Sequence, residues 1–391
     1  MDGPRACREE EFDAVIDLIN HTFRAGSDQN IRTDYPLIFN LSKLEYMRIL
    51  KVDGVVVSHV PVAPRQVIAR DDTFTIGIIS PTITHPEYRK RGYATLCLRD
   101  CIRIMEENNW PVSVLWTQEA TFPFYHHSGW EAVGCQGWTY GLEPGDQALF
   151  EAGSFEILPY DPDNARHLDA IIQIHDAEPY RIARSHAEYQ ALFALPKTST
   201  LLAMHRGEVA AYLTVSAATN KPGLIEAGGH PAGLEVLLNR VLSARDQEIQ
   251  ALAHLTPSVL DQLVEAKKPG TRRPIEEADG VGFQMLRINN LELLLRQIEP
   301  YLREKSMGLH GDVCLVCSDT DQVLTLEFRS GEVGFSAARS AAPVVLSRRQ
   351  LTQLIFGSHP DLEPLELGGD TGEILQQVFP YYFPIWELDH S

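Results

Sequence analysis

The sequence has little of what marks several common classes of protein. Six cysteines at irregular spacing among 391 residues exclude a small scaffold held together by disulfides. No stretch approaches the ~18 consecutive apolar residues that a membrane-spanning helix needs. Residues 1–4 begin neither the basic region nor the apolar region of a secretory signal peptide. We therefore expect a soluble, cytoplasmic protein.

Basic residues are also scarce, because 34 lysines and arginines stand against 53 aspartates and glutamates, for a formal net charge of −19. Binding to a phosphate backbone needs clustered basic side chains, so we expect neither a nucleic-acid partner nor a membrane partner. The electrostatic field of this negative net charge favours a cationic substrate, if the substrate is small and charged. Apolar residues make up 44% of the chain, and its length predicts two or three domains.

The first 150 residues predict alternating helices and strands. Apolar side chains at helical spacing predict a helix over residues 12–23. Asp53-Gly54 between two apolar runs predicts a hairpin. The other elements expected here are a strand at 74–84, a helix from Gly92, a strand at 112–116, a helical turn at 122–129 and a last strand near 130–140.

The order of helix, hairpin and helix then recurs. Helices are expected around 168–175 and 234–241, with a hairpin at 201–215 between them. This recurrence indicates a degenerate internal duplication with a period of roughly 150 residues.

From about residue 285 the composition changes to a leucine-rich helix at 291–302, followed by short strands and two more helices. Free tails are usually polar, so we expect the aromatic segment 379–391 to be docked. The chain therefore predicts an α/β (α+β) fold with mixed central sheets. Its expected domains are residues 1–150, 151–284 and 285–391.

A basic loop between a strand and a helix is the most informative stretch. Arg89, Lys90 and Arg91 are followed by Gly92, which lets the backbone approach a ligand, and Ala94 is small. The free N–H groups of the first helical turn and the helix dipole can hold an anion such as a pyrophosphate. An ordinary charged turn before a helix remains the alternative at this point. Neither the Walker pattern nor the dinucleotide fingerprint is present.

Two motifs in this region resemble a known family. Arg89-x-x-Gly92-x-Ala94 resembles the acetyl-CoA signature of the GCN5-related N-acetyltransferases. Residues 124–131, Phe-Tyr-His-His-Ser-Gly-Trp-Glu, are similar to the second motif of that family. The organisation of the whole chain resembles the enhanced-intracellular-survival acetyltransferases, which have a degenerate second acetyltransferase-like domain and a C-terminal sterol-carrier-like domain. Residues 228–233 lack the basic signature, so we expect no coenzyme in the second domain.

The resemblance implies an acetyl-CoA-dependent N-acetyltransferase that uses no metal. Tyr125 would be the general acid that protonates the leaving thiolate. A splayed strand would pair through its backbone with pantetheine, and the following loop and helix would hold the pyrophosphate. The residues so implied are Thr82, Ile83 and Thr84 on the strand, and Arg89, Lys90, Arg91, Gly92, Tyr93, Ala94 and Thr95 in the loop and helix.

The general base is less defined by the resemblance. In the family the C-terminal carboxylate acts as base, which here belongs to Ser391. The chain ends in Asp389-His390-Ser391 and not in an aromatic residue, so Asp389 and His390 remain alternatives. His85 and Glu119 are further alternatives as side-chain bases.

Other features have simpler interpretations. The cysteines of Cys314-x-x-Cys317 are expected in the core, because no second pair completes a zinc site. His126 and His127 leave a supporting contact with Tyr125 open. The loop 28–34 would border the acceptor pocket in the family or be a solvated loop. The C-terminal domain would be a scaffold that positions the tail, with a lipid tunnel as the alternative.

The function expected is acetyl transfer to a primary amine, such as an aminoglycoside, a polyamine or a lysine. The alternative is a non-catalytic acyl-CoA or lipid-binding protein on an acetyltransferase fold. The resemblance also implies a homo-oligomer, such as the hexamer that the family forms.

Overall fold

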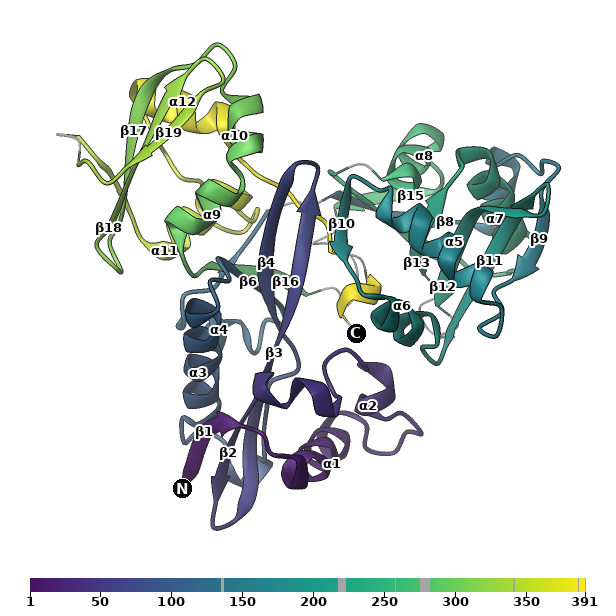
Figure 1. Cartoon of the computed structure of the whole chain (residues 1–391), viewed down its shortest axis with the longest axis horizontal. Coiled ribbons are helices and arrows are strands. Elements are labelled where there is room, and N and C mark those ends of the chain that lie inside the picture. The colour runs from purple at the N-terminus through teal and green to yellow at the C-terminus, as the bar shows by residue number, and fades with distance from the viewer. Residues whose placement is uncertain are drawn as a thin grey trace. The chain divides into compact units, whose positions relative to one another are not determined.

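The computed structural model describes residues 1–134, 137–216, 223–256, 258–274, 282–339, 342–385 and 387–390. The chain forms two compact units (Figure 1). The first unit contains residues 1–28, 38–135 and 280–382. The second unit contains residues 29–37, 136–279 and 383–391. No helix among the described residues is long and apolar enough to cross a membrane.

The first unit contains a mixed sheet in the order β1-β2-β3-β4-β6-β16-β7, and β5 pairs with β3 beside this path. Its β4 and β6 run parallel, and its other pairs are antiparallel. The strands are β1 (Asp2–Ala6), β2 (Met47–Val52), β3 (Val55–Ala69), β4 (Asp72–Ile79), β5 (Ile83–Thr84), β6 (Val112–Thr117), β7 (Glu131–Ala132) and β16 (Phe283–Ile288).

Helices α1 (Phe12–Phe23), α3 (Tyr93–Glu107) and α4 (Phe122–His126) accompany this sheet. The apolar side of α3 carries Cys97, Leu98, Cys101 and Met105, all fully buried against β2 and β3. The expected hairpin around Asp53-Gly54 joins β2 to β3, with both turn residues at positive φ. The helices expected at 12–23 and from Gly92 are confirmed.

The C-terminal part of the first unit has its own sheet, in the order β19-β18-β17-β20. Its elements are β17 (His310–Cys317), β18 (Gln322–Arg329), β19 (Val333–Ser336), β20 (Val344–Leu346), α9 (Leu291–Gln297), α10 (Glu299–Lys305), α11 (Arg348–Phe356) and α12 (Gly369–Val378). The single leucine-rich helix expected at 291–302 is wrong, because the chain breaks at Ile298 into α9 and α10. Pro300 has no N–H to continue the first helix. Cys314 and Cys317 are buried on β17, as expected.

The second unit contains two sheets, in the orders β13-β12-β11-β9 and β14-β8-β15. A parallel bridge between Gly223 and Gln250 links β13 to β14. The strands are β8 (Gly137–Leu142), β9 (Glu156–Pro159), β10 (Tyr180–Ala183), β11 (Thr198–His205), β12 (Glu208–Ser216), β13 (Leu224–Gly229), β14 (Ile249–His254) and β15 (Thr271–Pro274). The helices are α2 (Ile31–Asp34), α5 (Ala165–Asp176), α6 (His186–Phe193), α7 (Pro231–Ser243) and α8 (Val259–Lys267), with a short 3₁₀ turn η6 (Glu387–His390).

Two strands lie in a different sheet from the one that their sequence position suggests. The last strand expected near 130–140 is divided: β7 pairs with β16 in the first unit, whereas β8 pairs with β14 in the second. Conversely, β16 follows the second repeat in sequence yet pairs with β6 in the first unit. The mixed α/β fold with mixed central sheets is confirmed, and the division into three domains at residues 150 and 284 stays a proposal.

Candidate active site

Two neighbouring strands of the first unit separate where the sequence predicts a splayed strand. β4 pairs in parallel with β6 from Ile76 to Ile78. After Pro81 the chain continues as β5, which pairs with β3 through Ile83 and Thr84. The other edge of β6 remains paired with β16 as far as Thr117. The facing edges of β5 and the end of β6 therefore diverge, which provides backbone groups for an extended ligand.

The loop after β5 is held against the end of the strand. The backbone N–H of His85 donates to the carbonyl of Val57 at 2.8 Å, which extends the pairing with β3. Arg89 turns back, and its Nε donates to the Thr84 carbonyl at 3.2 Å. Arg91 donates to the Glu87 carbonyl at 3.1 Å and lies 5.1 Å from the Tyr88 ring centroid. Arg89, Lys90 and Arg91 are all exposed, so three positive charges gather at this loop.

The N-terminus of α3 is open in the way that an anion site requires. Lys90 and Gly92 have φ values of 61° and 78°, in the left-handed region, and Gly92 is the N-cap. The first hydrogen bond inside the helix runs from the Leu96 N–H to the Gly92 carbonyl at 3.0 Å. The N–H groups of Tyr93 and Ala94 therefore precede the helical ladder, together with that of Thr95. Gly92 carries no side chain to cap them, and the space where its Cβ would lie is empty to 4 Å.

Tyr125 lies on α4 in the hydrophobic core beside this region. It is 8% exposed, and its ring packs against Phe124 and Trp130 at centroid distances of 4.8 and 6.3 Å. Burial raises the pKa of the Tyr125 phenol, and the nearby Thr82 hydroxyl opposes part of this rise. The buried Thr82 hydroxyl makes no hydrogen bond of regular distance and angle with a described group. The structure thus brings Tyr125 to Thr82, at the separation of the strands.

His126 has partners other than Tyr125. Its ring stacks on Phe122 at 5.3 Å, and its Nδ1 lies 2.9 Å from a guanidinium nitrogen of Arg349 on α11. Its Nε2 lies 3.4 Å from a carboxylate oxygen of Glu131. His126 therefore fastens α4 to β7 and α11, and the supporting contact with Tyr125 left open by the sequence is not observed.

The candidate bases lie in separate environments. His85 is half-buried, accepts the Glu87 N–H at Nδ1 over 3.3 Å, and lines a cavity of about 480 Å³ beside α1. Glu119 is exposed on the loop after β6. Asp389 is buried in the second unit, where it pairs with Arg184 at 2.7 Å. Ser391 lies outside the described residues, as does the side chain of His390.

The loop expected to border an acceptor pocket divides between the two units. Residues 29–37 are grouped with the second unit. Asn30 caps the short α2 there by accepting the Arg32 N–H at 3.0 Å. A substrate contact by residues 28–34 stays a prediction.

Sequence reasoning missed Ser58 and Arg184. Ser58 and His59 are two polar residues inside the apolar run 55–62, and both are fully buried. A polar pair within such a run was the available signal for Ser58. Arg184 had no comparable local signal, because its partners are distant in sequence.

Comparison with known proteins agrees with this geometry. Residues 4–133 match the family model of the acetyltransferase (GNAT) domain. This match confirms the prediction of an acetyl-CoA-dependent acyltransferase, but it does not identify the acceptor. No curated protein matches the chain.

Several solved structures resemble most of the chain. A GCN5-related N-acetyltransferase from Anabaena variabilis matches 97% of this chain and 97% of its own, with 15% identity and a TM-score of 0.71. A probable N-acyltransferase of unknown function from Enterococcus faecalis matches 90% and 89%, with 14% identity and a TM-score of 0.68. Eis1 from Mycobacterium abscessus matches 91% and 90%, with 12% identity and a TM-score of 0.60. At such identities these likenesses show the fold.

Proposed function

We propose that this protein moves an acetyl group from acetyl-CoA to a primary amine, which attacks the thioester directly. The observation that carries the proposal is the proximity of Tyr125 to Thr82, where the chain passes from β4, paired with β6, to β5, paired with β3. The open N-terminus of α3 at Gly92 supports it, because that helix follows the same strand along the chain. Together these features provide an anion site for the coenzyme and a proton donor for its sulfur.

In the proposed reaction the pantetheine amides pair with the backbone of residues 82–84, and the pyrophosphate binds the first turn of α3. The amine nitrogen forms a bond to the acetyl carbon, and the bond from that carbon to sulfur breaks. Tyr125 gives its proton to the departing thiolate. Because burial raises the pKa of Tyr125 above its ordinary value of 10.0, the phenol holds this proton at neutral pH.

The amine must lose a proton before it attacks, since an alkylammonium has a pKa of ~10. We propose that the terminal carboxylate of Ser391 receives it, as the family resemblance implies. A carboxylate with a pKa of ~3.5 is a weak base, so this transfer would pass through water. The net charge of −19 favours a polycationic acceptor such as an aminoglycoside, a polyamine or a lysine side chain.

For the C-terminal sterol-carrier-like domain we propose a scaffold role. Phe379 and Tyr381 are buried, and Tyr301 packs edge-on against Tyr381 at 4.8 Å. The Tyr301 hydroxyl lies 2.8 Å from the Val378 carbonyl and 2.9 Å from that of Pro380. The chain's own aromatic segment thus packs against Tyr301 of α10. The homo-oligomer implied by the resemblance stays a prediction.

The test measures thiol release from acetyl-CoA with a panel of aminoglycosides, polyamines and lysine peptides. Tyr125→Phe is expected to lower kcat by about 10²–10⁴-fold, the usual contribution of a general acid, with coenzyme affinity nearly unchanged in calorimetry. Tyr140→Phe is the matched control, because Tyr140 is a buried tyrosine of the second unit. Full activity of Tyr125→Phe would disprove the proposed acid. Coenzyme binding without turnover on any amine would favour the non-catalytic acyl-CoA-binding alternative.

A further inference from the structure

The second unit repeats the layout of the acetyltransferase domain around β13. In both, an antiparallel hairpin (β2–β3 or β11–β12) precedes a strand that leads into a long helix, α3 or α7. The strand after that helix, β6 or β14, has a parallel link to an earlier segment: β6 pairs with β4, and Gln250 of β14 bridges to Gly223, just before β13. On its other edge, β6 or β14 pairs with an antiparallel strand, which is β16 for β6 and β8 for β14. β13 therefore corresponds to β4 together with β5, which continues it and which we assign to the coenzyme in the first domain.

The coenzyme features themselves are missing at the end of β13. Pro231 opens α7, and proline has no N–H to offer an anion. The Ala232 N–H is already taken, since it donates to Nδ1 of His230 at 3.2 Å. A helix start occupied in this way is a poor site for a pyrophosphate.

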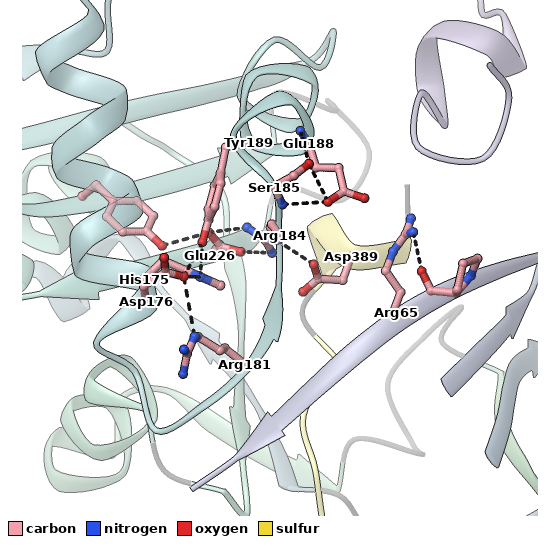
Figure 2. Close-up of polar contacts among 12 residues, drawn as sticks. Arg65, His175, Asp176, Arg181, Arg184, Ser185, Glu188, Tyr189, Glu226 and Asp389 are labelled. Carbon is pink, nitrogen blue, oxygen red and sulfur yellow. Dashed lines mark hydrogen bonds and ion pairs between the residues drawn. The ribbon is translucent and has the colours of Figure 1, made fainter. Parts of the chain in front are cut away.

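One of the segments that pack against β13 is the chain's own C-terminal turn η6. Arg184 joins the two (Figure 2): its Nη2 lies 2.6 Å from a carboxylate oxygen of Glu226 on β13, and its Nε lies 2.7 Å from Asp389 in η6. These three side chains are at most 1% exposed. Glu226 also accepts the Tyr212 hydroxyl at 2.8 Å. Burial disfavours the Arg184 charge, but the two carboxylates outweigh this and raise its pKa well above the ordinary value.

Apolar packing accompanies this pair of ion bridges. Leu388 is 2% exposed and belongs to the core cluster that contains Ile171, Tyr189 and Ile225. Apolar contacts alone would tolerate a shift of the tail by a residue, because they have no direction. A buried charge tolerates no such shift, because the partner that it leaves would be buried and unpaired. The single guanidinium between Glu226 and Asp389 therefore fixes the register of the tail.

We propose that Arg184 is a positioning residue that holds the C-terminal carboxylate in place for proton removal from the amine. The second domain, on this view, has exchanged coenzyme binding for binding of the tail. The terminal carboxylate is two residues beyond Asp389, so fixing Asp389 limits its reach to about 7 Å. This inference rests on the proposed function, in which the carboxylate of Ser391 is the base.

The first experiment measures docking of the tail without reference to activity. Carboxypeptidase is added to the full-length protein, and loss of C-terminal residues is followed by mass spectrometry. Arg184→Met and Asp389→Asn are expected to speed trimming at least tenfold, and Arg184→Lys should restore part of the protection. The matched control is Arg181→Met, since Arg181 is a nearby arginine of the same unit that contacts Asp176 and not the tail.

Because Arg184→Met leaves Glu226 buried without its cation, this variant can lose stability. The double variant Arg184→Met/Glu226→Gln removes both charges and still removes the ion pair of Asp389 with Arg184. It should fold and should show the same fast trimming. Trimming as slow as in the unchanged protein, in this variant and in Asp389→Asn, would overturn the proposed role of Arg184.

The second experiment separates this inference from the proposed function. The Arg184 and Asp389 variants should lower kcat at least tenfold with little change in KM for acetyl-CoA, and a chain ending at Leu388 should lose turnover. If the shortened chain loses turnover but the Arg184 variants keep it, the positioning role is wrong, and a base among residues 389–391 stands. If the shortened chain keeps full turnover, the terminal carboxylate is not the base and the positioning role falls with it.

Discussion

The hydroxyl of Ser58 on β3 lies 2.9 Å from the hydroxyl of Thr84 on β5. The same Ser58 hydroxyl donates to the Ile83 carbonyl at 3.0 Å. Both contacts bind β5 to β3 and so draw it away from β6, at the separation that we assign to the coenzyme. A buried serine thus helps to hold β5, one edge of the candidate active site, on β3.

Ser58→Ala tests this role. Loss of a hydrogen bond is worth about 1 kcal/mol, so we expect the affinity for acetyl-CoA to fall roughly fivefold. Ser113→Ala is the matched control, because Ser113 on β6 is also fully buried and its hydroxyl has no partner among the described residues. Calorimetric titration of both variants gives the comparison. Equal affinities in the two variants would mean that Ser58 does not shape the coenzyme site.

Gly92 is required by its backbone conformation and not by lack of space. Its φ is 78°, and a methyl group there would meet nothing within 4 Å. Gly92→Ala should cost about 1–2 kcal/mol of folding stability and weaken acetyl-CoA binding at least tenfold, because the loop relaxes away from the anion site. Gly207→Ala is the matched control, with a φ of 84° and equally open space in the β11–β12 turn. It should show a similar loss of melting temperature with unchanged coenzyme affinity.

The candidate site could be predicted where its parts are local. Residues 82–95 form one continuous stretch, in which a strand end, three basic residues and a glycine have fixed local consequences. Tyr125 follows only one strand later. Local signals also gave the α1 helix and the hairpin at Asp53-Gly54.

The parts that were missed depend on contacts between distant residues. Residues 137–142 form the same kind of strand whichever sheet they join, so nothing local assigns β8 to β14. Arg184 pairs with Asp389 across 205 positions, and 53 acidic residues compete as partners in the sequence. His126 finds Arg349 across 223 positions in the same way. By contrast, the break at Ile298 had a local signal in Pro300.

Asp72 makes the stability of the first unit depend on pH. It is 3% exposed at the start of β4, and its carboxylate accepts the Tyr301 N–H at 3.2 Å. Burial raises its pKa from 3.8 to about 6, against the smaller opposing effect of that hydrogen bond. Between these two values the folded state binds more protons than the unfolded state. The free energy of unfolding therefore falls as the pH rises through this window, and the loss persists above it.

Asp72→Asn removes the buried charge and keeps an oxygen to accept the Tyr301 N–H. It should stabilise the protein at pH 7 by up to about 3 kcal/mol, with little gain near pH 4. Urea unfolding at pH 4 to 7 measures the difference, and the exposed neighbour Asp71 provides the control variant Asp71→Asn. A gain that is the same at every pH would show that ionisation of Asp72 is not its source.

The two related helix starts also predict how many coenzyme molecules bind. At Gly92 the first-turn N–H groups precede the helical ladder, and three exposed basic residues lie before them. At the start of α7 the His230 imidazole accepts the Ala232 N–H, and Pro231 has no N–H. Calorimetry should therefore find one acetyl-CoA per chain, and Gly92→Ala should weaken that single binding event. If a second acetyl-CoA molecule binds per chain and its affinity is unchanged in Gly92→Ala, the second domain keeps a coenzyme site. The tail bound at β13 would then share its domain with a ligand, and Arg184 would need a role beyond holding the tail.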